Sequence, residues 1–154
     1  MKNAADKLTT NEAPIAVQVS RTFSQAPERV FDAFLTASTA RRFLFATEHG
    51  VMVRAELVPL VGGVFIFTDR RDGVDVDHCG EYLEIERPRR LVFDFGVPAH
   101  SPKRGRVVIE IAPAGSGAML TLTQEMAPEF AAYADRTQRG WTMMLANLDK
   151  VLAE

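Results

Sequence analysis

The chain has a single cysteine among its 154 residues, so it cannot form an internal disulfide bond. Disulfides persist in oxidising compartments, and a lone cysteine is therefore typical of a protein from a reducing one. The first stretch, MKNAADKLTTNEAP, is polar and lacks the apolar centre of a secretion signal. Together these features favour a cytoplasmic location.

Long apolar runs and an excess of one charge are also missing. No run approaches the roughly 20 apolar residues that a transmembrane helix needs, so we expect no membrane span. The formal net charge of −2 gives no general attraction to nucleic acid or to anionic lipid. The basic clusters Arg41-Arg42 and Arg87-Arg89-Arg90 have no aromatic residues between them, so they indicate solvated turns and no nucleic-acid partner.

The sequence lacks the paired ligands of a metal site. The one polar cluster, DVDHC, contains Asp75, Asp77, His78 and Cys79, but adjacent strand residues point to opposite faces, so at most two of the four share a face. A structural zinc needs about four ligands, and no CxxC or HxxxH pair supplies the rest. Nucleophilic catalysis by Cys79 would need a base and an orienting group. We therefore expect no metal, no cofactor and no catalytic residue, and interpret the cluster as a solvated acidic face with a buried cysteine.

What the sequence does have is material for a core. Hydrophobic residues make up 47% of the chain, and no repeat, linker or low-complexity tract divides it. This predicts one globular domain over residues 14–154, preceded by a loose tail at residues 1–13.

Periodicity predicts the order of the elements. Alternating apolar residues indicate a strand at 15–24, and i, i+4 apolar pairs after Pro27 indicate a short helix at 27–35, followed by another at 38–45. Hairpin-length turns then separate six expected strands, which should therefore be antiparallel. These strands are 51–58, 64–70, 74–86, 91–95, 106–112 and 119–126.

The C-terminal segment is expected to be one long helix that begins at Pro128 and covers the apolar face of the sheet. Its apolar stripe recurs at three and four residues: Phe130, Ala134, Thr137, Trp141, Leu145, Leu148 and Leu152. Gly140 interrupts the helix at a cost of about 1 kcal/mol relative to alanine, which suggests that something approaches closely there. The predicted class is α+β, a curved antiparallel sheet around this helix.

The strand at 74–86 changes phase, because Val74 and Val76 are apolar at even positions whereas Leu83 and Ile85 are apolar at odd ones. Gly80 lies at the change, which predicts a β-bulge there. Val76 and Leu83 should then share the helix-facing side with His78, and Asp75 and Asp77 should face solvent.

Five motifs occur in an order that resembles a known family. They are APERVFDAF (26–34), GGVFIF (62–67), GEYLEIERPRRLVFDF (80–95), LTLTQE (120–125) and GWTMMLANLDKVL (140–152). The chain resembles the START-like superfamily, also called SRPBCC, and within it the heat-shock protein 90 ATPase activator homologues. This resemblance implies a helix-grip (START/Bet v-like) fold with a cavity between sheet and helix. Two departures stand out: Phe43-Leu44-Phe45 replaces a common tryptophan, and Gln124 lies near a frequent histidine.

We place a candidate hydrophobic cavity near Trp141, because this tryptophan lies on the helix stripe, although plain core packing is the favoured interpretation of any single candidate residue. Arg21, Tyr82 and Thr137 are candidate polar groups, and Arg21 could instead pair with a carboxylate. The candidate lining residues are Phe45, Phe65, Phe67, His78, Phe95, Tyr133, Thr137, Trp141 and Met144.

Three functions remain open at this point. We favour non-enzymatic binding of a small hydrophobic or amphipathic molecule, with a stress-related role suggested by the family name. The alternatives are a cyclase- or aromatase-like enzyme that uses the same cavity, and a chaperone-interaction module. The eukaryotic activator has a separate N-terminal domain for which this chain has no room, so we expect no stimulation of a chaperone ATPase. A monomer and a homodimer are both compatible with the sequence.

Overall fold

The computed structural model describes residues 13–154, and the tail expected at residues 1–13 lies, apart from Ala13, outside the described residues. The observed order is a strand, two short helices, six strands and a C-terminal helix, as predicted. The elements are β1 (Ile15–Phe23), α1 (Pro27–Leu35), α2 (Ala37–Ala40), β2 (Val51–Leu57), β3 (Val64–Arg71), β4 (Val74–Glu86), β5 (Arg90–Gly96), β6 (Gly105–Ala114), β7 (Gly117–Met126), the 3₁₀ helix η1 (Pro128–Tyr133) and α3 (Ala134–Leu152).

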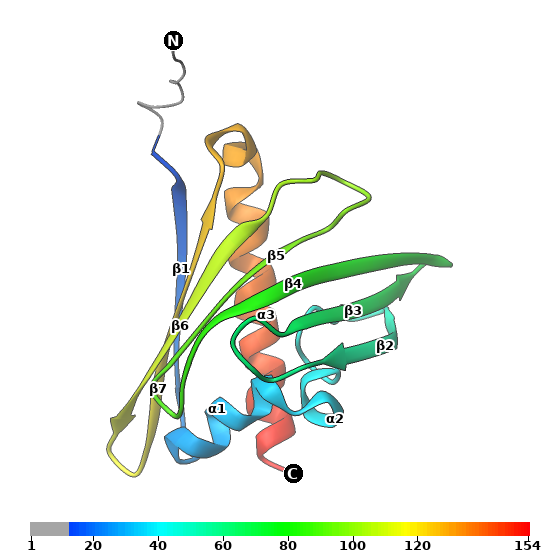
Figure 1. The fold of residues 1–154 in the computed structure, drawn as a ribbon. Helices are drawn as coiled ribbons and strands as arrows, with labels where there is room; N and C mark the ends of the chain where they lie inside the picture. The colour runs from blue at the N-terminus through cyan, green and yellow to red at the C-terminus, as the bar shows by residue number, and fades with distance from the viewer. Residues whose placement is uncertain (1–12) are drawn as a thin grey trace.

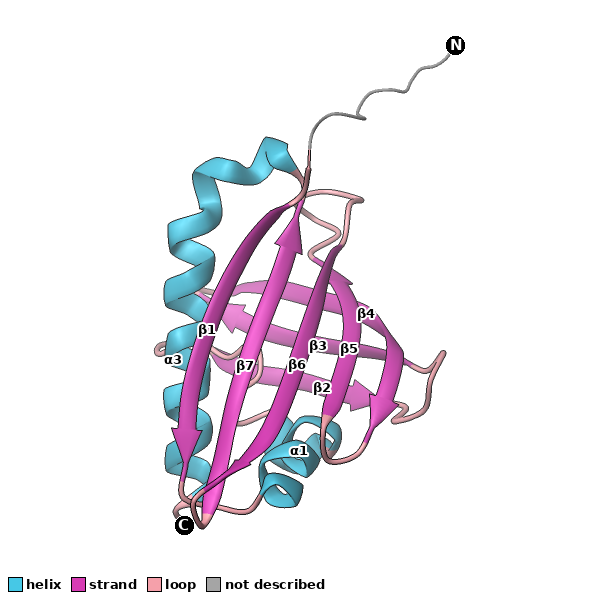
Figure 2. Ribbon diagram, turned by 90° about the vertical axis from the view of Figure 1, so that its left-hand side faces the viewer, coloured by secondary structure: helices cyan, strands magenta, loops and turns pink. Residues whose placement is uncertain are grey.

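The strands form one seven-stranded antiparallel sheet with the order β1-β7-β6-β5-β4-β3-β2. The first strand along the chain therefore pairs with the last one. The sheet is strongly curved, so that β2, β3 and β4 cross behind β1, β7 and β6 in Figure 2. Helix α3 runs along the concave side (Figure 1). This arrangement confirms the predicted helix-grip fold.

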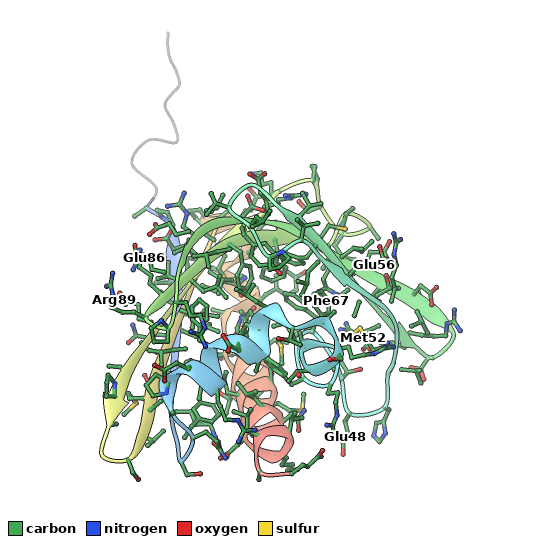
Figure 3. All side chains as sticks on the ribbon, turned by 60° about the horizontal axis from the view of Figure 1, so that its bottom comes forward. Glu48, Met52, Glu56, Phe67, Glu86 and Arg89 are labelled. Carbon is green, nitrogen blue, oxygen red and sulfur yellow. The ribbon has the colours of Figure 1, made fainter. Side chains whose placement is uncertain are left out.

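Helices α1 and α2 close one end of the curved sheet (Figures 1 and 3). Pro27 occupies the first turn of α1, where its fixed φ suits a helix start, and the buried Phe31 and Phe34 hold α1 on the core. The second helix is shorter than the predicted 38–45: it ends at Ala40, residues 41–45 form turns, and Phe45 adopts a positive φ of 60°. A right-handed helix cannot continue through that conformation.

The C-terminal helix is also divided, contrary to the prediction of one helix from Pro128. Residues 128–133 form the 3₁₀ turn η1, in which Phe130 has non-helical angles (φ −98°, ψ 15°), and the α-helix begins at Ala134. The buried residues of α3 all belong to its second part: Trp141, Leu145, Leu148 and Leu152. The predicted apolar stripe therefore enters the core only from Trp141 onward.

The predicted bulge at Gly80 is wrong in its position. Gly80 pairs regularly with Phe65 of β3 and with Phe95 of β5, whereas the register of β4 against β5 shifts between Tyr82 and Glu84. Leu83 is thus the extra residue. A side chain at position 80 would collide with the Phe65 ring and with the Asp94 carbonyl oxygen, which explains the glycine.

The core lies between the concave face of the sheet, α1 and the second part of α3. Figure 3 shows Phe67 beneath the arch of the sheet, whereas Glu56, Glu86 and Arg89 project away from it. His78 is buried on the concave face and Asp75 and Asp77 are exposed, as predicted. Among the helices formed by residues 13–154, none combines the length and the apolar character needed to span a bilayer.

Candidate functional site

Two neighbouring cavities lie beneath η1 and the first part of α3. The larger, of about 600 Å³, opens between α3, the turn after α2 and the ends of β3, β4 and β5. The smaller, of about 480 Å³, extends toward η1 and the β5–β6 connection, which lies beside α3 in Figure 1. Their linings overlap, so they form one space, called here the α3 groove. The shared residues are Phe95, Val97, His100, Gln124, Arg136 and Thr137.

The groove exists because residues 134–140 of α3 bury no side chain, although Gln138 Nε2 donates to the Gln18 carbonyl oxygen of β1 at 3.3 Å. None of the residues of η1 is buried, and Tyr133 and Met143 are exposed. Gly140 adds to the space, since a Cβ built there would meet only the Met144 methyl carbon, at 4.0 Å. Nothing approaches Gly140 closely, contrary to the expectation from sequence. The glycine instead leaves part of the groove wall without a side chain.

Phe45 is the centre of the groove floor. Its ring stacks on His78 with the centroids 4.6 Å apart and the planes 13° apart, and it lies 4.8 Å from the Phe95 ring and 5.8 Å from the Trp141 ring. Aromatic pairs at such separations stabilise a fold by about 0.5–1.5 kcal/mol each beyond their burial. The aromatic floor is therefore a connected and firmly held surface.

The backbone of Phe45 is held from both sides. Its N–H donates to the Met144 sulfur at 3.1 Å, and its carbonyl oxygen accepts from the Arg71 guanidinium at 3.3 Å. These contacts hold a φ of 60°, a left-handed conformation that costs a non-glycine residue roughly 1–2 kcal/mol. The conformation places the ring between the sheet and α3, where it separates the groove from the core.

His78 contributes a neutral imidazole to the floor. Burial, together with the nearby positive charge of Arg71, lowers the pKa of the His78 imidazole to about 4. Its Nδ1 lies 3.3 Å from the Phe67 carbonyl oxygen, which can only accept, so the proton of the neutral ring belongs on Nδ1. The Nε2 atom, at the far end of the side chain, is then an acceptor.

Trp141 and Gln124 join α3 to β7 across the floor. The indole Nε1–H donates to Gln124 Oε1 at 2.6 Å, and both side chains are buried. Gln124 occupies the position where the resemblance leads one to expect a histidine. An amide oxygen satisfies the buried indole N–H at any pH, whereas a histidine would do so only when unprotonated.

One end of the groove is closed by a buried carboxylate and its partners. Asp69 is fully buried and accepts from the Thr47 hydroxyl at 2.6 Å and from Arg71 Nε at 2.8 Å. The charge of Arg71 is thereby compensated. Sequence reasoning missed this group, although a single aspartate in the apolar strand VFIFTDR was a usable signal.

The rim of the groove is basic. Arg136 and Arg139 are exposed, three residues apart on α3, and the Arg136 guanidinium carbon lies 5.5 Å from the Tyr133 ring centroid. Lys103 and Arg104, at the other end, pair with Glu129 and Asp94. Sequence reasoning missed this rim, because its members are far apart in the sequence and the overall charge is slightly negative.

The structure places most of the candidate residues around the groove. Tyr133 lines the smaller cavity, whereas Phe65 and Phe67 are buried in the core behind Phe45. Phe45, His78, Phe95, Thr137, Trp141 and Met144 line the larger cavity.

The remaining polar candidates lie away from the groove. Arg21 pairs with Asp149 on the second part of α3, at 2.9 Å. This is the carboxylate partner that we expected from the sequence as the alternative to a ligand contact. Tyr82 is buried with its ring 5.3 Å from that of Phe65, and burial raises the pKa of its hydroxyl.

The polar stretch of β4 is dispersed over two faces. Asp75 pairs with Arg70, and Asp77 accepts from the Thr68 hydroxyl at 2.7 Å. Cys79 is half-buried and not fully buried as expected, and burial raises the pKa of its thiol. Within residues 13–154, no three histidine, cysteine or acidic side chains meet in an arrangement that could hold a metal ion.

The family assignment agrees with this geometry. A family model described as Activator of Hsp90 ATPase homolog 1-like protein matches residues 24–153. The chain therefore belongs to this family, within the START-like (SRPBCC) superfamily. No curated protein matches the chain.

Solved bacterial structures share the fold. Protein CV1439 from Chromobacterium violaceum is 24% identical, with a TM-score of 0.77 over 88% of this chain and 95% of that one. Protein NE0264 from Nitrosomonas europaea is 17% identical, with a TM-score of 0.79 over 90% and 94%. SA2116 from Staphylococcus aureus, a protein of unknown function, is 14% identical, with a TM-score of 0.81 over 92% and 95%. At these identities the likeness concerns the fold.

Proposed function

We propose that the protein binds a small hydrophobic or amphipathic molecule in the α3 groove and does so without catalysing a reaction. The observation that carries the proposal is the groove itself: a space of about 600 Å³ against the first part of α3, where residues 134–140 bury no side chain. Ligand sites of small molecules commonly have volumes of roughly 300–1,000 Å³ and apolar linings with a few polar groups. The groove has both properties.

The lining suits an apolar ligand of variable shape. Phe45, Phe95 and Trp141 provide a rigid aromatic floor, and Met143 and Met144 provide flexible thioether side chains above it. Burial of apolar surface contributes roughly 25 cal/mol per Å² before the costs of association. We expect dissociation constants in the micromolar range, which correspond to about −8 kcal/mol.

The two alternatives gain less from the geometry. Two histidines line the larger cavity. The low pKa of the His78 imidazole makes it a weak base, and His100 is exposed, with no acidic side chain of residues 13–154 in the lining to orient it. A chaperone-interaction role is suggested by the family name, and the groove adds no argument for it. Binding is thus the function that the site supports best.

The test is a titration of the protein with 1-decanol and with 2-naphthol, followed by Trp141 fluorescence and by calorimetry. Trp141 is the only tryptophan and lies on the groove floor. Gly140→Leu should fill the open wall and weaken binding at least about tenfold, because the ligand would lose contact area that the leucine occupies. Thr142→Leu adds a leucine to an exposed position of the same helix and should leave binding unchanged.

Saturable binding by the parent protein and by Thr142→Leu, but not by Gly140→Leu, would support the proposal. Absence of a saturable response to either compound, or equal affinity in Gly140→Leu, would refute it. Mass spectrometry of molecules retained by the gently purified protein would then identify the natural ligand.

A further inference from the structure

We propose that the ligand of the α3 groove is an amphipathic anion, whose apolar body lies over the floor and whose acidic head group lies against Arg136 and Arg139. This inference rests on the proposed function and narrows it to a chemical class. The head group is defined by its chemistry, a carboxylate or a phosphate, since guanidinium groups bind both in the same way.

The charged residues that line the groove are all cationic. Arg71, Arg104, Arg136, Arg139 and Lys103 line the two cavities, and within residues 13–154 no aspartate or glutamate side chain does. The chain as a whole has a net charge of −2, so this gathering is not a consequence of a basic composition. Like charges repel one another, so such a lining favours an anionic partner.

Three of these five cations already pair with a carboxylate of the described chain, and two do not. Arg71 is compensated by the buried Asp69, and Lys103 and Arg104 are paired with Glu129 and Asp94. For Arg136 and Arg139, no carboxylate of the described part of the chain lies within 4.0 Å. These two guanidinium groups, which have no carboxylate partner within residues 13–154, are therefore the ones that an incoming anion can contact without displacing a partner from this part of the chain.

Their positions suit a head group at the mouth of the groove. Residues three apart on a helix are neighbours on its surface, so both guanidinium groups can reach one anion. The Tyr133 ring lies beneath the Arg136 guanidinium and limits its freedom, which lowers the cost of ordering it on binding. Both arginines are exposed, so the anion would keep part of its hydration and avoid the cost of full burial.

The floor fixes the opposite end of the ligand. Phe45, Phe95 and Trp141 offer apolar faces, and the neutral His78 offers an acceptor nitrogen that would repel an anionic oxygen. An acidic group at the floor would thus lose its hydration beside neutral groups such as the Gln124 amide, whereas the rim offers it two guanidinium groups. The apolar body of the ligand therefore contacts the aromatic floor, and its acidic head group points outward to the arginines of the rim.

The experiment compares three probes of equal chain length, decanoate, 1-decanol and decyltrimethylammonium, by calorimetry below the concentrations at which they form micelles. Decanoate should bind about tenfold more tightly than 1-decanol in 50 mM NaCl, and decyltrimethylammonium should bind most weakly. In 500 mM NaCl the advantage of decanoate should shrink to about threefold or less, because salt screens exposed charges.

Variants separate the head-group contact from the groove. The double variant Arg136→Gln/Arg139→Gln should reduce decanoate affinity to that of 1-decanol and leave 1-decanol binding unchanged. Arg106→Gln is the control, because Arg106 is an exposed arginine of β6 outside the groove lining, and it should leave the affinity of both probes unchanged.

Equal affinity for decanoate and 1-decanol in the parent protein would overturn the inference and leave the proposed function intact. A preference for decanoate that persists in the double variant would overturn the role of the two arginines. If none of the three probes binds, the groove is not a binding site and both proposals fail.

Discussion

Phe45 shows how a single residue can separate a core from a binding space. Its positive φ turns the aromatic ring into the interval between β3, β4 and α3, where it contacts His78, Phe95 and Trp141. Strained backbone conformations persist only where the surrounding contacts over-determine them, and they are frequent at ligand sites. In this molecule the contacts come from Met144 on the helix and Arg71 on the sheet.

His78 makes stability depend on pH. Its folded-state pKa of about 4 lies below the value of 6.5 expected in the unfolded chain, so between these values the unfolded state binds more protons. Stability is therefore full above about pH 7 and decreases as the pH falls through 6.5 toward 4. From pH 7.5 to pH 5.0 this one group should lower the free energy of unfolding by about 2 kcal/mol.

Urea denaturation at the two pH values measures this loss. His78→Gln should remove about 2 kcal/mol of the difference between the two pH values, whatever its effect on stability at pH 7.5. His100→Gln changes an exposed histidine and should keep the dependence of the parent protein. An unchanged pH dependence in His78→Gln would show that the imidazole is protonated in the folded protein at pH 5.

At the scale of elements, two glycines that look alike in the sequence occupy opposite surroundings: one position is crowded and the other is open. Gly80 of β4 is required because the Phe65 ring and the Asp94 carbonyl oxygen occupy the space of a side chain. Gly140 of α3 has open space around it and lines the groove. The sequence gives both the same appearance, since each interrupts an otherwise regular element.

The same substitution should therefore have opposite effects. Gly140→Ala should raise the free energy of unfolding by about 0.5–1 kcal/mol, because alanine favours the helix and meets no obstacle. Gly80→Ala should lower it by about 1–3 kcal/mol or more, because the Phe65 ring has to move. Urea denaturation at pH 7.5 measures both values, and a stabilising Gly80→Ala would contradict the register of β4.

The elements themselves could be predicted from sequence to the extent that local pattern determines them. The bounds of α1 and β4 follow directly from helical and alternating apolar spacing. The end of α2 and the 3₁₀ start of the C-terminal helix were not predicted, because the apolar pattern shows neither the turns at residues 41–45 nor the non-helical backbone angles of Phe130. The bulge at Leu83 was detected as a phase change, but its position depends on pairing with β5.

At the scale of the molecule, the curved sheet and the two-part helix leave a groove at one end and a packed core at the other. Trp141 marks the division, since it is the first buried side chain of α3, and Leu145, Leu148 and Leu152 follow it. The sequence indicated that Trp141 and its aromatic neighbours would meet. It could not indicate the basic rim, because Arg136, Arg139, Lys103 and Arg104 come together only through the arrangement of η1, α3 and the β5–β6 connection.

The most direct test of the central claim is the location of a bound ligand by nuclear magnetic resonance, with ¹⁵N-labelled protein titrated with decanoate and with 1-decanol. Binding in the α3 groove predicts saturable shifts of the Trp141 indole resonance and of amides in residues 45–47, 95–100 and 136–144. The amide resonances of α1 and of the last turns of α3, which belong to the packed end, should not shift. Shifts confined to the outer face of the sheet, or shifts at α1 that exceed those at residues 136–144, would contradict the account.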